Sequence, residues 1–95
     1  MPTMADYASP VVKDTLAQRA KKSAETNAMF DAHRSVWRYR DTAIVTPAYT
    51  RAALLQSGWE LSRGQSPTYR TAFMSAFADA WTVRYTELTG KAVAP

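Results

Sequence analysis

The stretch that decides the fold is SPTYRTAFMSAFADAWTVRYTELTG, residues 66–90, which carries the signals of one complete helix. Ser66 is suited to cap the helix N-terminus with its hydroxyl, and Pro67 is suited to the first helical position, where its missing N–H costs nothing. No proline or glycine follows until Gly90, which favours the left-handed conformation that commonly ends a helix. The sequence therefore predicts a helix between Ser66 and Gly90.

Apolar side chains cover a wide arc of this predicted helix. At about 100° per residue the arc spans roughly 220°, whereas a surface helix needs an apolar stripe only somewhat over 100° wide. We therefore expect this helix to be central, with neighbours on two sides, or to face another chain. Arg70 and Arg84 interrupt the arc, but their stems can cover apolar surface while the guanidinium groups reach outward. The arc comprises Tyr69, Ala72, Phe73, Met74, Ala76, Phe77, Ala80, Trp81, Val83, Tyr85 and Leu88.

The composition is that of one small globular domain covering residues 1–95, with loose termini expected at 1–8 and 91–95. The chain carries a net charge of +4, a modest positive field that is compatible with nucleic-acid or acidic protein partners. It has no cysteine, which excludes disulfides, thiol nucleophiles and thiolate metal sites. No apolar run is long enough to span a bilayer, and the N-terminus lacks a signal-peptide pattern. We expect an intracellular, cytoplasmic protein.

Two further helices are predicted upstream of residue 26 and downstream of residue 46. Ser9-Pro10 repeats the pattern of a cap residue followed by proline, and it predicts a helix start there. Thr26-Asn27 is the expected break, because both residues are mediocre helix formers; the alternative is one helix of about thirty residues. The predicted buried face of this first helix is mostly alanine, which implies close or weak packing, and comprises Val12, Leu16, Ala20 and Ala24.

Residues 31–45 are compatible with either a helix or a strand. A helical stripe favours the helix, whereas the alternation in Trp37-Arg38-Tyr39-Arg40 is typical of a strand. We prefer the helix, because the neighbouring segments are helical and an isolated strand has nothing evident to pair with. The stripe comprises Phe30, His33, Val36, Trp37, Arg40 and Ile44.

Thr46-Pro47 predicts the start of another helix, which ends at Gly58 or continues to Arg63. Its predicted apolar face comprises Tyr49, Ala52, Ala53, Leu55 and Trp59. A helix-turn-helix around Gly58 fails, because Gly64 and Pro67 fall where the recognition helix should run. The predicted fold is all-α, a small bundle of three or four helices around the C-terminal helix.

The sequence does not support catalysis, and we expect no enzyme activity, cofactor or metal site. His33 is the only histidine, and it lies two residues from Asp31, a spacing at which two helical side chains do not face each other. The eight acidic residues are scattered, and three glycines in the whole chain leave no phosphate-binding loop.

Arginine and aromatic residues concentrate in one segment, residues 33–40. Arginine forks suit phosphate or carboxylate, and aromatic faces can stack on bases. On a helix Arg34 and Arg38 share one face, and we expect Trp37 to turn toward the core. A solvated, arginine-rich helix face explains the same pattern without any ligand. Nucleic-acid binding is therefore the alternative function, with Arg34, Trp37, Arg38 and Arg40 as its site.

The leading prediction is a non-catalytic structural or interaction protein that docks on a partner protein or forms a subunit of a larger assembly, for example a compact inhibitor or adaptor. The wide arc of the C-terminal helix predicts an apolar patch on the monomer, which would meet another protein or a copy of itself. The candidate partner-binding residues are Tyr69, Phe73, Trp81 and Tyr85.

Overall fold

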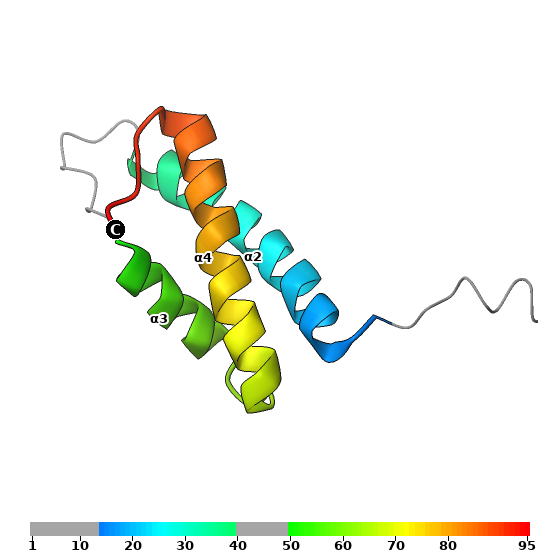
Figure 1. Ribbon diagram of the computed structural model, residues 1–95. Helices are drawn as coiled ribbons and strands as arrows, with labels where there is room; N and C mark the ends of the chain where they lie inside the picture. The colour runs from blue at the N-terminus through cyan, green and yellow to red at the C-terminus, as the bar shows by residue number, and fades with distance from the viewer. Residues whose placement is uncertain (1–13, 40–49) are drawn as a thin grey trace, which may run out of the picture.

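A computed structural model describes residues 14–39 and 50–95 of the chain, and within them it contains three helices and no strand. They are α2 (Leu16–Tyr39), α3 (Arg51–Leu61) and α4 (Pro67–Thr89). Figure 1 shows α4 between the other two, with α2 running in the same direction as α4 and α3 running in the opposite direction. The predicted all-α bundle around the C-terminal helix is confirmed.

Both ends of α4 form as their residue types predict. The Ser66 hydroxyl accepts a hydrogen bond from the Tyr69 N–H at 3.3 Å, and Pro67 occupies the first turn. At the other end Gly90 adopts φ 71°, and its N–H donates to the Thr86 carbonyl. These contacts satisfy backbone groups that a helix end otherwise leaves without partners. The predicted central helix is therefore confirmed at both ends.

The face of α2 that meets α4 is a stripe of alanines, one every four residues. All four of its members are fully buried, and against them pack the large side chains of α4. Alanine projects only one methyl group. The α2 backbone can therefore lie close to the aromatic rings that α4 directs toward it. We call this row the alanine stripe; it comprises Ala20, Ala24, Ala28 and Ala32.

The predicted break at Thr26-Asn27 is wrong, because α2 runs through it without interruption. The Thr26 hydroxyl donates to the Lys22 carbonyl and the Asn27 side-chain amide donates to the Ser23 carbonyl, so both side chains bond back to the preceding turn. The alanine stripe is buried on both sides of these two residues, so tertiary packing outweighs their weak helix propensity.

The start of α2 also differs from the prediction. Ser9-Pro10 lies outside the described residues, but Asp14 and Thr15 are not helical, and the helix begins at Leu16. Thr15 and Gln18 form a reciprocal capping box: the Gln18 N–H donates to the Thr15 hydroxyl, and the Thr15 N–H donates to the Gln18 side chain. Leu16 is 38% exposed, so the buried row begins one turn later, at Ala20.

The preference for helix over strand is confirmed for residues 31–39, which belong to α2; residues 40–45 lie outside the described residues. The predicted stripe through this part is not the buried one, however. Phe30 is 69% exposed and Trp37 is 53% exposed, because the alanine stripe takes the side that faces α4. At 100° per residue, Trp37 points about 140° away from Ala32.

Helix α3 packs on the other side of α4 from α2. It begins at Arg51, later than the predicted start at Thr46-Pro47, and that dipeptide lies outside the described residues. Thr50 is its N-cap, with the hydroxyl accepting from the Ala53 N–H. Its apolar face is also rotated from the predicted one: Leu54 and Gly58 are buried, whereas Ala52 and Ala53 are exposed.

Gly58 neither ends α3 nor forms a turn; it marks the closest approach of α3 to α4. A Cβ atom at this position would lie 2.7 Å from the Met74 Cα and 3.2 Å from the Phe77 Cβ. Since the nearest atom belongs to the backbone of α4, only a shift of a whole helix could make room. The absence of a side chain at Gly58 therefore sets the distance between the two helices.

Arg70 joins the lower ends of α3 and α4. Its guanidinium carbon lies 3.7 Å from the centre of the Trp59 ring, and its Nη2 donates to the Trp59 carbonyl at 2.7 Å. The side chain thus combines a cation–π contact with a cap on a carbonyl near the end of α3. The expectation that the Arg70 guanidinium reaches outward is wrong, because the guanidinium itself lies over the Trp59 ring and donates to the Trp59 carbonyl.

The C-terminal tail 91–95 is not loose, contrary to the prediction. Gly90 turns the chain back toward the start of α3, where the Arg51 N–H donates to the Ala94 carbonyl at 2.9 Å (Figure 1). Val93 packs against the core cluster. The predicted arm 1–8 lies outside the described residues.

We predict that Gly58→Ala lowers the free energy of unfolding by about 2 kcal/mol, because the added methyl group overpacks the α3–α4 contact. At an exposed helical site the same change would raise stability by up to about 1 kcal/mol, since alanine is the better helix former. Denaturant unfolding followed by circular dichroism measures the difference, with Ser57→Ala on the exposed side of α3 as the control. A stabilised Gly58→Ala variant would contradict the close approach.

We predict that Ala24→Leu lowers the free energy of unfolding by about 1–3 kcal/mol, because three extra carbons must enter the tight α2–α4 contact. The matched control is Ala52→Leu, which adds the same atoms at an exposed position and should change stability by less than about 0.5 kcal/mol. Thermal and denaturant unfolding of both variants provide the measurement. Equal stabilities of the two variants would show that the alanine stripe does not control packing.

Candidate functional site

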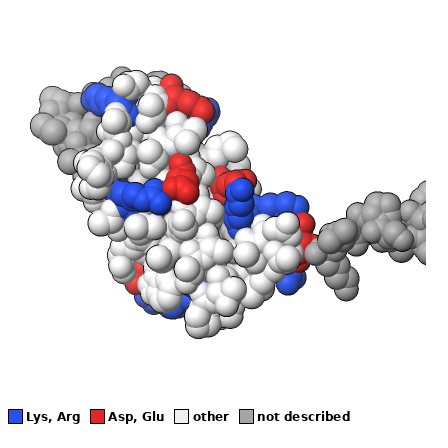
Figure 2. All heavy atoms as spheres, in the orientation of Figure 1, with Lys and Arg blue, Asp and Glu red and all other residues white. Residues whose placement is uncertain are grey.

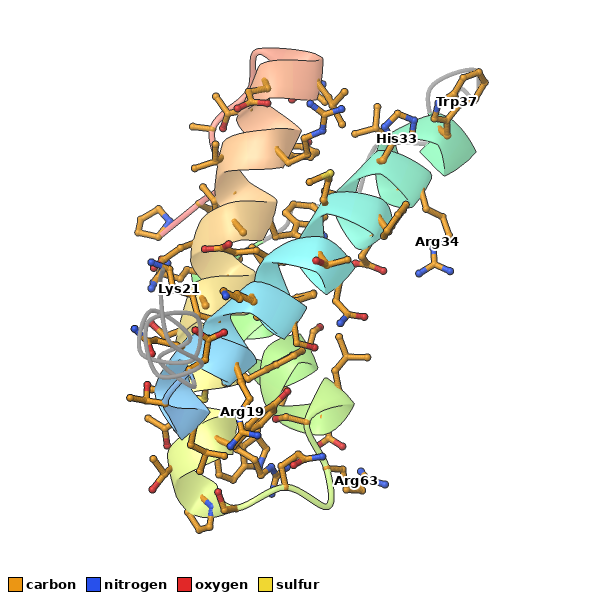
Figure 3. The ribbon with its side chains drawn as sticks, turned by 90° about the vertical axis from the view of Figure 1, so that its right-hand side faces the viewer. Arg19, Lys21, His33, Arg34, Trp37 and Arg63 are labelled. Atoms are coloured by element: carbon orange, nitrogen blue, oxygen red, sulfur yellow. The ribbon has the colours of Figure 1, made fainter. Side chains whose placement is uncertain are left out.

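One side of α2 carries large side chains that the core does not use. They occur at spacings of three, four and seven residues, which places them on one helix face, pointing away from the alanine stripe. The two largest, Phe30 and Trp37, are 69% and 53% exposed. Figure 3 views this side of α2 and shows His33 and Trp37 near its end. We call this surface the outer face; it comprises Phe30, His33, Arg34 and Trp37.

The outer face is connected to the core through Asp31. The buried Trp81 indole N–H donates to one Asp31 carboxylate oxygen at 3.0 Å, while the other oxygen pairs with the Arg34 guanidinium at 3.2 Å. A buried indole N–H needs an acceptor, so Asp31 satisfies the core and orients Arg34 at the same time. The His33 and Trp37 rings lie next to each other, with centroids 6.5 Å apart.

The residues predicted to form an apolar patch are placed differently. Phe73, Trp81 and Tyr85 are at most 6% exposed, and Tyr69 is half-buried, so an exposed patch built on these rings is wrong. They form stacked pairs inside the bundle: Tyr69 on Phe73 at 6.0 Å and Trp81 on Tyr85 at 5.1 Å between ring centroids. The physical reason is the alanine stripe, which leaves room for these rings between α2 and α4.

The arginine–tryptophan segment is only partly described. Arg34 is exposed on the outer face, Arg38 belongs to α2, and Arg40 lies outside the described residues. The expectation that Trp37 turns toward the core is wrong, since more than half of its surface is exposed. The structure thus brings Arg34, Trp37 and His33 together on one face (Figure 3).

A groove of about 700 Å³ lies between α2 and α4, and its lining residues all belong to these two helices. Its walls combine small apolar residues with charged ones, and Met29 and Val83 are 52% and 58% exposed there. Figure 2 shows a face on which small groups of charged side chains are separated by wide uncharged areas. We call this surface the α2–α4 groove; it is lined by Ala17, Lys21, Glu25, Met29, Ala72, Ser75, Ala76, Asp79, Ala80, Val83, Arg84 and Glu87.

Three of the α4 residues in this groove are already paired. Arg84 contacts Glu87 at 3.1 Å, and Asp79 contacts Arg51 at the start of α3 at 2.7 Å. The Arg84 Nε atom is buried and has no hydrogen-bond partner in the described part of the chain. The polar rim of the groove on α4 is therefore held by contacts within the protein.

Sequence reasoning missed the α2–α4 groove and turned Trp37, a member of the outer face, toward the core. The signal that could have corrected both is the continuation of the alanine row past Asn27, to Ala28 and Ala32. Once the alanine row is taken as the buried face, Phe30 and Trp37 must point outward, and Met29 must lie at the edge.

The described residues contain no cluster of three or more histidine, cysteine or acidic side chains that could hold a metal ion. Within the same ranges, no helix is both long enough and apolar enough to cross a membrane. No family model matches the sequence, and neither a curated protein nor a solved structure matches it.

Proposed function

We propose that this protein is a non-catalytic binding protein that docks on another protein through the outer face of α2. The observation that carries the proposal is the exposure of Phe30 and Trp37 on a helix whose opposite side is fully packed. Aromatic side chains are the most frequent anchors of protein interfaces, because they desolvate a large area with few rotatable bonds.

The spacing of the outer face indicates how the partner binds it. Phe30, His33, Arg34 and Trp37 stand at positions i, i+3, i+4 and i+7, the pattern by which an amphipathic helix enters an apolar groove. The two aromatic anchors are separated by two helical turns, about 10 Å along the axis. The proposed partner therefore has an apolar groove with two pockets at that spacing, and a carboxylate or carbonyl near Arg34.

The core does not depend on these anchors, so their removal separates binding from folding. We predict that the double variant Phe30→Ser and Trp37→Ser keeps the helix content and the unfolding midpoint of the parent within a few degrees. The same variant should lose the protein that the parent retains from an extract of the source cell, identified by mass spectrometry. Circular dichroism is measured on the same samples.

The matched control is Leu61→Ser on α3, which is 57% exposed and lies outside the outer face. It should retain the same protein as the parent. A partner that binds the double variant as well as the parent would place the docking surface elsewhere on the molecule.

Nucleic-acid binding is the second candidate, and the observation that favours it is that Arg34 and the exposed Trp37 lie on the same face of α2, three residues apart. A base can stack on the indole while the guanidinium contacts a phosphate. Arg34 is already paired with Asp31, and this carboxylate would compete with a phosphate for the guanidinium. Nucleic-acid binding is therefore the weaker of the two candidates.

For this second candidate we predict binding of a labelled single-stranded oligonucleotide at low salt that weakens steeply as salt rises. Replacing Arg34, Arg38 and Arg40 with glutamine should abolish it, whereas Arg63→Gln, an exposed arginine near the α3–α4 loop, should leave it unchanged. Fluorescence anisotropy across a salt series measures both effects. Absence of binding by the parent at low salt would eliminate this candidate.

A further inference from the structure

We propose that the α2–α4 groove holds α2 of a second copy of this chain, so that two copies pair around a two-fold axis with their α2 helices antiparallel. The proposal concerns a different side of α2 from the outer face: Lys21 projects to one side of the helix and Arg34 to the other (Figure 3). It therefore stands or falls independently of the proposed function.

The first argument is charge complementarity. The part of α2 that lines the groove is a row of one residue every four, namely Ala17, Lys21, Glu25 and Met29. In the reverse direction the basic and acidic positions of the row exchange places, so two antiparallel copies of the row are complementary in charge. When two such rows pair antiparallel about their midpoint, Lys21 of each copy meets Glu25 of the other. A two-fold interface requires this kind of self-complementary pattern, because each residue contacts its counterpart twice.

The two charges are available for such pairing. Lys21 and Glu25 are four residues apart on one helix, yet no ion pair within the described part of the chain engages either of them. Their order, lysine before glutamate, is the less favourable one for a contact along the helix. Neighbouring Lys22, in contrast, is paired with Asp14.

The second argument is the size of the side chains at the two ends of the groove. Because α2 and α4 run in the same direction, Ala17 and Ala72 line one end, and Met29 and Val83 line the other. A two-fold axis through the middle places the large end of one copy against the small end of the other. The exposed Met29 thereby gains a site lined by alanines, which covers apolar surface in both copies.

Sedimentation equilibrium on the full chain across a concentration series tests the pairing. The parent should dimerise, and Lys21→Glu or Glu25→Lys alone should raise the dissociation constant by about tenfold or more, because both symmetric contacts become repulsive. The double exchange, Lys21→Glu with Glu25→Lys, should restore association. Lys91→Glu in the C-terminal tail makes the same charge change outside the groove and should leave association unchanged. All variants are checked for helix content.

Mixing the two single variants tests the charge pairing, and a disulfide between copies tests the antiparallel register. One copy then carries two acidic residues and the other two basic ones, so the mixed pair should form while each variant alone stays dissociated. Since the chain has no cysteine, Ala17→Cys and Met29→Cys copies mixed under oxidising conditions should also form a disulfide between copies. A parent that is monomeric up to about 1 mM overturns the proposal, as does a dimer that none of the charge reversals weakens.

Discussion

The contact on which the rest of the structure depends is that between the alanine stripe of α2 and the aromatic row of α4. An alanine loses no side-chain entropy on burial and allows close helix approach, so the volume between the helices is left for Phe73, Phe77, Trp81 and Tyr85. Phe77 and Trp81 are the largest fully buried side chains, and both belong to α4. Within the described residues α4 thus supplies every buried aromatic side chain of the core, whereas α2 and α3 supply four alanines and Leu54.

The contact between α3 and α4 also joins a small residue on the neighbour to large residues on α4, and here the small residue is Gly58. Gly58 brings the α3 backbone against Met74 and Phe77, and Arg70 covers the Trp59 ring where the two helices meet the loop. Small residues on the neighbours and large residues on α4 explain how a chain of 95 residues surrounds a helix whose apolar arc is so wide. The same division leaves the large side chains of α2 without a place inside, and they remain on the surface as the outer face.

The two candidate surfaces therefore follow from one packing choice. With the alanine stripe turned inward, Phe30 and Trp37 face solvent on one side, and the row from Ala17 to Met29 lines the groove on the other. In the proposed arrangement a two-fold pair would carry two outer faces, and a partner with two binding sites would be held by both. Asp31 connects the outer face to the core, because it accepts from the buried Trp81 and orients Arg34.

The sequence by itself determined the helical class and both ends of α4, because caps, a leading proline and a terminal glycine act through contacts with the adjacent turn. It also placed Ala20 and Ala24 on the buried side. Only the tertiary structure decided that α2 continues through Thr26-Asn27, that Trp37 faces outward and that the tail joins α3. In each case the deciding contact lies between segments far apart in sequence. Helix propensity and periodicity describe each segment alone, whereas burial depends on which neighbour fits it most closely.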